Sequence, residues 1–530
     1  MLSNILMGLS ALANVQSILL MLVGTLAGIV VGGIPGLNGS MAIALLIPIT
    51  YAMDPVVALA MLCGIYNGAM YGGSISAILF GIPGTPAACA TVIDGHPLAK
   101  KGQAMRALEL SASGSCFGGM VSVAILIVAA PTLAKFALKF GAAEYFWVGM
   151  FGLSIIVSLS NDSMIKGIIT GFFGLFLAMI GQDPNTAVPR FLLRFIPKMG
   201  TLKVSTQLLG GLELVPVLVG LFALPEVFYM LEHAGEAKAV DTSSSTSIDF
   251  KEKVHPFDQF SKRWVNYIRS AIIGTIVGII PAAGGNIASF ISYDMAKRAS
   301  KDPNSFGKGN PDGVLASETA NNGVTGGSFV PLLSLGVPGS TSTAVIMGAF
   351  MIQGINLGPS IFNTNAELVY ALMMALLLTN IPMLFIGFYG SKVFSKSLNM
   401  PQNVLAPLIL AFAVVGSYAI RYNMFDVIVL FFFGLLGYLM NKLKFPMAPL
   451  VLGLILGSIV ESNLLRALAL SHGSVTGLVN SPISWVLFIL VLLCLVTGVR
   501  NVIQSRSTFT IGNDIVEAVD AEQAESESEK

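Results

Sequence analysis

The chain has 530 residues, of which 54% are hydrophobic and 11% charged, and its mean hydropathy is +0.79. About a quarter of the residues in a soluble domain are charged, so this composition excludes an ordinary globular protein. The formal net charge is +1, and no basic stripe with interleaved aromatic residues is present. The sequence therefore indicates a membrane protein and gives no sign of nucleic-acid binding.

Apolar segments recur along the whole chain. A helix needs about 20 apolar residues to cross roughly 30 Å of hydrocarbon, and several segments reach or approach that length. The plainest are Leu110–Ala130, Leu368–Gly390, Leu405–Tyr418, Val427–Met440 and Trp485–Val499. We predict an all-α polytopic membrane protein with roughly 10–14 membrane elements, some of them too short to span the bilayer.

Two polar stretches interrupt this pattern. Glu232–Lys262 contains a run of Ser and Thr followed by mixed charges, which is typical of an aqueous linker, and Ser505–Lys530 is acidic and has no apolar stripe. The sequence therefore predicts a first membrane repeat at 1–231, a polar cytoplasmic linker at 232–263, a second membrane repeat at 264–504 and an acidic cytoplasmic tail at 505–530.

The two membrane parts share an internal duplication. Four short blocks return in the same order about 250 residues later, which indicates a structural repeat. The blocks of the first half are Gly24–Gly28, Pro35–Gly39, Asn67–Ser74 and Gly81–Thr85, and their counterparts are Gly274–Gly278, Pro281–Gly285, Asn321–Ser328 and Gly336–Ser340.

Lys and Arg are distributed in opposite ways in the two halves. The loop after the last block carries Lys100, Lys101 and Arg106 in the first half, whereas its counterpart, 351–365, has neither residue type. Between the blocks the first half has none at 51–66, whereas the second half has Lys297, Arg298, Lys301 and Lys308. Because Lys and Arg concentrate in cytoplasmic loops, this reversal predicts two repeats of inverted topology.

The Pro- and Gly-rich breaks predict a substrate site. Broken backbone at membrane depth has to line a cavity, and a helix that begins there presents free N–H groups to an anion. Breaks at equivalent places in two halves indicate the binding site of a secondary transporter, although kinks or tight turns are the alternative. The substrate-binding candidates are Asn38, Gly39, Ser40, Gly84, Thr85, Pro86, Gly284, Gly285, Asn286, Gly339, Ser340 and Thr341.

Polar residues near the breaks are candidates for ion coupling. Asn67 and Asn321 are costly at membrane depth without partners; each could bind a cation through its carbonyl or a carboxylate through its amide. Hydrogen bonding between helices is the alternative. The full ion-coupling set is Asn67, Gly73, Ser74, Asn321, Gly327 and Ser328, whereas Glu318 is interpreted as a charge at the end of a loop.

Enzyme signatures are missing. The sequence contains no H-E-x-x-H, no G-x-S-x-G and no G-x-x-x-x-G-K-[ST], so nothing predicts zinc hydrolysis, a nucleophile elbow or nucleotide-driven pumping. We therefore predict no enzyme, and transport energised by an ion gradient. A passive anion channel and an unrecognised integral membrane enzyme stay open as alternatives.

Longer motifs carry a family resemblance. They are Pro35-Gly36-Leu37 with Gly39, Tyr71-Gly72-Gly73-Ser74, Gly81-Ile82-Pro83-Gly84-Thr85-Pro86, Asp94-Gly95-His96-Pro97-Leu98 and Leu335-Gly336-Val337-Pro338-Gly339-Ser340. Up to about residue 500 the chain closely resembles the TctA type, the large membrane subunit of the bacterial tripartite tricarboxylate transporters. Asn38 is a departure that bears on ligand selectivity, because this break commonly carries Gly.

The resemblance implies a secondary active transporter of the bacterial cell inner membrane. Such carriers work with a small membrane subunit and an extracytoplasmic solute-binding protein, and they move citrate or related tricarboxylates and dicarboxylates with sodium ions or protons. No cofactor and no metal are expected beyond this coupling cation. Paired broken hairpins from both halves would enclose one carboxylate site near the membrane midplane and expose it to each side in turn.

Overall fold

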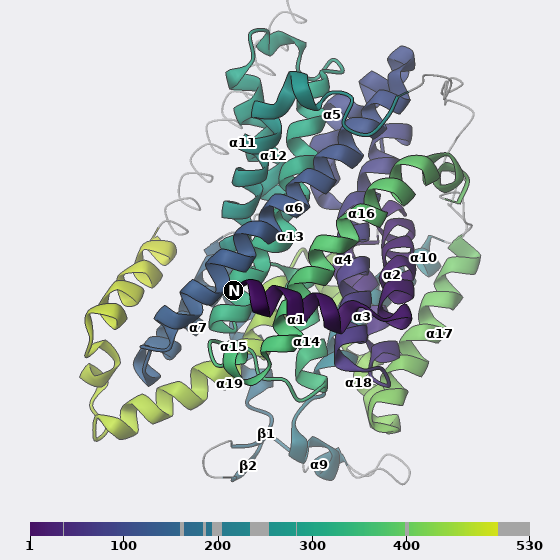
Figure 1. Cartoon of the computed structure of the whole chain (residues 1–530). Helices are drawn as coiled ribbons and strands as arrows, with labels where there is room; N and C mark the ends of the chain where they lie inside the picture. The colour runs from purple at the N-terminus through teal and green to yellow at the C-terminus, as the bar shows by residue number, and fades with distance from the viewer. Residues whose placement is uncertain are drawn as a thin grey trace, which may run out of the picture. The chain divides into compact units, whose positions relative to one another are not determined.

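A computed structural model describes residues 1–34, 37–158, 164–183, 187–192, 204–233, 254–281, 283–397 and 402–496. Within these ranges the chain is almost entirely helical (Figure 1). It forms two compact units: a larger one from Met1–Phe140 with Leu177–Leu443, and a smaller one from Gly141–Phe176 with Lys444–Lys530. Most of the predicted linker at 232–263 and all of the predicted tail at 505–530 lie outside the described residues.

The helices of the larger unit begin with α1 (Leu2–Leu12), α2 (Val15–Gly33), α3 (Gly39–Thr50), α4 (Pro55–Phe80), η1 (Pro86–Ala88), α5 (Cys89–Leu98), η2 (Ala99–Gln103) and α6 (Ala104–Ala137). After the smaller unit's first segment come the paired strands β1 (Gly181–Gln182) and β2 (Pro189–Arg190), then α9 (Val204–Gln207), η3 (Leu208–Gly210) and α10 (Leu214–Glu232). The remaining helices are α11 (Phe260–Ile279), α12 (Gly284–Ala299), η5 (Pro303–Ser305), α13 (Pro311–Leu335), α14 (Thr341–Ile352), α15 (Ile361–Thr364), α16 (Ala366–Ser397), α17 (Gln402–Arg421) and α18 (Met424–Lys442).

The smaller unit contains α7 (Ala142–Ser158), most of α8 (Met164–Ala178), α19 (Met447–Leu470), η6 (Val475–Val479) and a helix at Pro482–Val496. The Trp147 indole N–H donates to the Leu478 carbonyl oxygen at 2.7 Å, which ties α7 to η6. Of these helices, only the last was expected from the sequence, as the apolar segment Trp485–Val499, and the separate unit was not expected.

Among the described residues, seven helices are long and apolar enough to cross a membrane, and six shorter apolar helices accompany them. The seven are Val15–Gly33, Pro55–Phe80, Pro86–Ala137, Leu214–Glu232, Ala366–Ser391, Met424–Lys442 and Met447–Leu470. The prediction of an all-α polytopic membrane protein is therefore confirmed.

Glycines bring α2 and α4 into close parallel contact. A Cβ atom at Gly28 would overlap the carbonyl oxygen of Ile65, and one at Gly32 would overlap that of Ala69. Small residues at helix interfaces permit such approach in membrane proteins. Because both positions advance by four residues together, the two helices run in the same direction.

The same packing recurs between α11 and α13. A Cβ atom at Gly274 would overlap the carbonyl oxygen of Ala320, and one at Gly278 would lie 2.9 Å from that of Val324. These helices also run parallel. The two glycines of α11 thus occupy the places that Gly28 and Gly32 have in α2, so the predicted pairing of Gly274–Gly278 with Gly24–Gly28 is wrong by four residues.

One helix of each parallel pair, α2 or α11, forms a helical hairpin with the helix that follows it in the chain. The chain leaves α2 after Gly33, α3 begins at Gly39 beside Ala69 in the middle of α4, and α3 ends at Thr50 shortly before α4 starts. We call α2 and α3 the first hairpin. In the second hairpin, α11 and α12, Gly285 at the start of α12 lies beside Asn321 of α13.

A return segment follows each of the long helices α4 and α13. Gly81 and Gly336 end these helices at φ +70° and +73°, a conformation that glycine adopts without strain. The chain then doubles back, so that the Gly84 N–H donates to the Gly73 carbonyl oxygen at 3.2 Å and the Gly339 N–H to that of Ser328 at 3.3 Å. A new helix starts at once, η1 with α5 after the first return segment and α14 after the second.

Helices α4 and α13 run antiparallel where they meet. The Tyr66 hydroxyl lies 3.2 Å from Ser328 Oγ, whereas Met70, one turn further along α4, accepts a hydrogen bond at 2.9 Å from Asn321 Nδ2, two turns earlier in α13. The tips of both hairpins and both return segments are therefore placed around this crossing.

Candidate substrate and ion site

Helices α3 and α14 meet at their N-termini. Ser40 Oγ donates to Thr341 Oγ1 at 3.0 Å and lies 3.1 Å from Ser342 Oγ. A Cβ atom at Gly39 would lie 3.4 Å from the same Ser342 oxygen, so the backbone of α3 reaches this point closely. The start of one hairpin arm in the first half thus faces the helix that follows the second return segment.

Helices α12 and η1 meet in the reciprocal way. A Cβ atom at Gly285 would overlap Asn321 Oδ1 and would lie 2.9 Å from Met70 Cε and 3.3 Å from Ala87 Cβ. The second hairpin therefore touches the helix that follows the first return segment. Together these contacts assemble four helix N-termini around the crossing of α4 and α13.

The three N-cap side chains at these N-termini differ in whether their oxygen atoms already form hydrogen bonds within the protein. Asn38 Oδ1 accepts from the Met41 N–H at 2.9 Å, and Ser340 forms a reciprocal capping box with Thr343. Both follow ordinary N-cap chemistry. Thr85 also occupies an N-cap, but its buried hydroxyl has no partner among the described residues. The Thr85 hydroxyl therefore keeps an unused hydrogen-bonding capacity and is buried against Gly73 of α4.

Other predicted residues line the more open part of the site. Pro86 and Asn286 are exposed, and Gly284 is half-buried. Gly284 has φ +62°, and no heavy atom lies within 4 Å of where its Cβ would be. The helix starts at η1 and α12 are therefore accessible from outside the protein interior.

Two asparagines take equivalent positions in the two halves. Asn67 Nδ2 donates to Thr379 Oγ1 of α16 at 2.8 Å, and Asn322 Nδ2 donates to Ser115 Oγ of α6 at 2.8 Å. Both side chains are fully buried, and both Oδ1 atoms lack a partner among the described residues. The return-segment bonds align Gly73 with Ser328, which makes Asn322 the counterpart of Asn67 and shifts the predicted register by one residue.

The remaining ion-coupling candidates make contacts within the helix bundle. Ser74 Oγ donates to the Tyr71 carbonyl oxygen at 2.8 Å and lies 2.6 Å from Ser111 Oγ. A Cβ atom at Gly73 would lie 2.5 Å from Thr85 Oγ1. At Gly327 it would overlap the carbonyl oxygen of Thr275.

Ser328 connects the return segment to the crossing of α4 and α13. Its hydroxyl lies 3.2 Å from the Tyr66 hydroxyl, which is itself 3.3 Å from Ser340 Oγ. Tyr66 is therefore a site residue that the sequence pattern missed.

The interpretation of Glu318 as a loop-end charge is wrong. Glu318 lies within α13, and its side chain is 0% exposed. The hydroxyl of Thr91 donates to its Oε1 atom, and Ser115 Oγ donates to its Oε2 atom at 3.3 Å. A carboxylate is thus placed one helical turn before Asn321 and Asn322 in the same helix.

Asp94, from the Asp94–Leu98 motif, anchors the loop between α12 and α13. Its Oδ1 atom accepts backbone N–H groups of Gly307, Gly309 and Asn310 at 2.9, 2.7 and 2.7 Å, and its Oδ2 atom accepts from the Tyr293 hydroxyl at 2.9 Å. A carboxylate that accepts several N–H groups holds them strongly.

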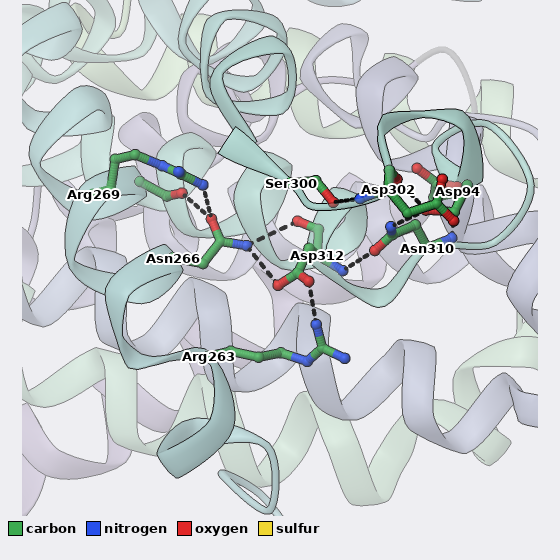
Figure 2. A network of polar contacts seen from close by, with 10 residues as sticks. Asp94, Arg263, Asn266, Arg269, Ser300, Asp302, Asn310 and Asp312 are labelled. Atoms are coloured by element: carbon green, nitrogen blue, oxygen red, sulfur yellow. Dashed lines mark hydrogen bonds and ion pairs between the residues drawn. The ribbon is translucent and has the colours of Figure 1, made fainter. Parts of the chain in front are cut away.

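Figure 2 shows this network continuing past Asn310 to Asp312, which is bonded to Asn266 and Arg263. The motif therefore fixes α5 to the second half of the chain.

The fold and these contacts define a multi-pass helical membrane protein with a polar site among four helix N-termini. The profile of the Tripartite tricarboxylate transporter TctA family matches residues 18–452, and the chain belongs to this family. The resemblance found in the motifs is thereby confirmed. Membership makes the chain a membrane transporter subunit and implies a tripartite transporter with a small membrane subunit and a solute-binding protein.

Two proteins of Agrobacterium vitis are similar to this chain. One, described as an uncharacterized 52.8 kDa protein in the TAR-I ttuC' 3' region, is 36% identical over 510 residues, which cover 96% of this chain and 98% of the relative. The other, an uncharacterized protein in the TAR-II ttuC' 3' region, is 36% identical over 233 residues, or 44% of this chain and 96% of the relative. No solved structure matches this chain.

Proposed function

We propose that the chain imports a small organic carboxylate, of the citrate or dicarboxylate class, across the bacterial inner membrane by cation-coupled alternating access. The convergence of the four helix N-termini carries this proposal. Each N-terminus presents unpaired backbone N–H groups and about half a positive charge. Several of them together suit a ligand that carries more than one carboxylate.

The chemistry of the surrounding side chains agrees with this ligand. The contacts described at the four N-termini involve hydroxyls, amides and backbone groups, without a Lys or Arg side chain. Helix ends and hydroxyls would therefore neutralise and orient the substrate. This arrangement favours release as well as binding, because no fixed cation holds the ligand.

The repeated packing supports an inverted-repeat mechanism. The α2–α4 and α11–α13 pairs use matching glycines, and α4 runs antiparallel to α13. In an inverted pair of repeats, exchange of the two hairpin conformations converts an outward-facing carrier into an inward-facing one. We propose that the two hairpins move against the long helices in this way.

Transport is expected to require both a partner and a gradient. The test uses vesicles that contain this chain with its small membrane subunit, external solute-binding protein and radioactive citrate as the probe. Omitting the binding protein or collapsing the cation gradients should reduce accumulation to the level of empty vesicles. Full-rate uptake without a gradient would instead establish a passive channel, and conversion of citrate to another product would establish an enzyme.

Thr85 is expected to bind the substrate directly. Thr85→Ala should raise the apparent KM about ten- to hundredfold at unchanged thermal stability, because a hydrogen bond to a charged group contributes about 1.5–3 kcal/mol. Ser340→Ala is the matched comparison: its hydroxyl already caps α14, so its loss should lower stability by about 1 kcal/mol. An unchanged KM in Thr85→Ala would assign the ligand to another place.

The predicted sidedness of the loops can be tested by labelling single cysteines. The loops 94–106 and 294–312 are predicted to face the cytoplasm together, and Lys101 Nζ donates to the Lys308 carbonyl oxygen at 2.6 Å, so they lie at the same end of the bundle. Cysteines at Gly102 and Asn304 should react only from the cytoplasmic side, whereas cysteines at Met53 and Asn363 should react only from outside. Labelling of Gly102 and Asn304 from opposite sides would contradict the proposed topology.

A further inference from the structure

Glu318 is a buried carboxylate that the sequence pattern gave no role. Within the part of the chain that the structure describes, its two oxygens accept hydrogen bonds from the hydroxyls of Thr91 in α5 and Ser115 in α6, and the Asn321 side chain also interacts with the carboxylate. Among the described residues, no ion pair involves Glu318. An ionised carboxylate in such surroundings has a large desolvation cost, which neutral hydrogen-bond donors alone do not offset. A bound cation would supply the charge that offsets this cost.

The other half of the chain shows that the packing does not need this carboxylate. Glu318 precedes Asn322 by four residues, and Cys63 precedes Asn67, the counterpart of Asn322, by the same interval. Cys63 is fully buried, with its Sγ 3.9 Å from the Leu372 carbonyl oxygen. Two equivalent places therefore hold a small apolar side chain in one half and an acid in the other, so the acid has a function beyond filling space.

A second group points into the same cluster. Asn322 Nδ2 donates to Ser115 Oγ, the same atom that donates to Glu318, while Asn322 Oδ1 is fully buried and has no partner among the described residues. The Tyr71 hydroxyl of α4 is near enough to Glu318 to interact with it electrostatically, and it also lacks a hydrogen-bond partner among the described residues. Oxygen atoms of carboxylate, carbonyl and hydroxyl type are the ligands that hard cations take.

We propose that Glu318 binds the coupling cation, as a sodium ion held with Ser115, Thr91 and Asn322 or as a proton on the carboxylate itself. The proposal deepens the transport function above and rests on the coupling proposed there. In both forms one positive charge neutralises Glu318. The asymmetry with Cys63 gives one such cation per chain at this pair of equivalent places.

The position of Thr91 explains how cation and substrate would be linked. Thr91 lies six residues after Thr85, on the helix segment whose N-terminus faces the substrate site. Its bond to Glu318 fastens that segment to α13. Binding of a cation at Glu318 replaces or reorients this bond, so the occupied and empty states hold Thr85 differently.

The test measures cation binding by the purified full-length chain with its small membrane subunit, without carboxylate and without a gradient. Radioactive sodium reports a bound sodium ion, and infrared difference spectroscopy reports a protonated carboxyl group. The variants are Glu318→Gln and, in case that variant does not fold, Glu318→Cys, which places there the residue that the other half has. Glu109→Gln is the matched control, because Glu109 is also fully buried, on α6, with Ser113 as its hydroxyl partner.

Saturable sodium binding that is lost in both Glu318 variants and kept in Glu109→Gln is the expected result for sodium. A carboxylic acid band that vanishes in the Glu318 variants and persists in Glu109→Gln is the expected result for a proton. Either signal unchanged in the folded Glu318 variants, or neither signal in the native chain, overturns the inference. Because no substrate is present, that outcome leaves gradient-driven citrate uptake to be judged separately.

Discussion

Gly339→Ala and Gly339→Val are expected to abolish the folded transporter. A Cβ atom at this position would lie 2.5 Å from the Gly278 carbonyl oxygen, 2.6 Å from Ser328 Cα and 2.8 Å from Ser328 Cβ. Backbone atoms cannot yield as a flexible side chain does, so the penalty is expected to exceed the 1–3 kcal/mol or so that is typical of an overpacked core. Thermal stability in detergent and yield of monodisperse protein measure the effect.

Gly339 is also one of the substrate-binding candidates from the sequence, so a close approach of the ligand to its backbone would be a different reason for the same sensitivity. In the structure the space beside Gly339 belongs to α11 and α13. The two explanations are separable, because a packing defect lowers stability without ligand whereas a binding defect does not. Gly210→Ala is a suitable control, since no heavy atom lies within 4 Å of its Cβ position, and it should leave stability unchanged. A Gly339→Ala variant of native stability would contradict the packing explanation.

Asp94→Ala is expected to be the second severe variant. It leaves three part-buried backbone N–H groups and the buried Tyr293 hydroxyl without their acceptor, and a buried unpaired donor costs about 1–3 kcal/mol. We expect a loss of stability of at least about 3 kcal/mol and loss of transport. Asp94→Asn should be milder, because one amide oxygen can still accept the three N–H groups.

The matched control is Asp302→Ala in the same loop. Asp302 is exposed, and the hydrogen bonds recorded there use its backbone N–H and carbonyl groups, so its carboxylate can be removed with little effect. Thermal unfolding of the three variants, followed by uptake measurements on those that fold, checks the order. Equal stability of Asp94→Ala and Asp302→Ala would show that the hydrogen bonds to the Asp94 carboxylate do not hold the loop.

The breaks were the part of the site that the sequence predicted well. Pro and Gly restrict the backbone by local sterics, so Pro281 and Gly339 mark interruptions without knowledge of the tertiary fold. Asn322 was missed because aligning the identical residues Gly72-Gly73 with Gly326-Gly327 makes Asn321 the counterpart of Asn67. In the structure, helix packing and the return-segment hydrogen bonds match Gly72 with Gly327 instead. A register between two helices is fixed by their contacts, which a single sequence does not display.

Glu318 was missed for a related reason. Helix α13 carries many polar residues and falls short of the hydropathy that marks a membrane span, so a charge within it reads as a loop residue. The helix is nevertheless buried along most of its length, because α4, α6 and α11 surround it rather than lipid. High hydropathy is required where a helix contacts hydrocarbon. A helix enclosed by other helices can be less hydrophobic and still lie within the membrane.

The reciprocal contacts between α3 and α14, and between α12 and η1, have a consequence for the protein as an assembly. Each helix start that contributes to the site meets a helix start from the opposite half of the chain. A polypeptide that comprised only one half would keep its own hairpin and return segment but would leave both unmatched. Separated halves would therefore have to find each other before either could bind a ligand, and an ancestral single-length form would have to pair with a second copy of itself to make the same site.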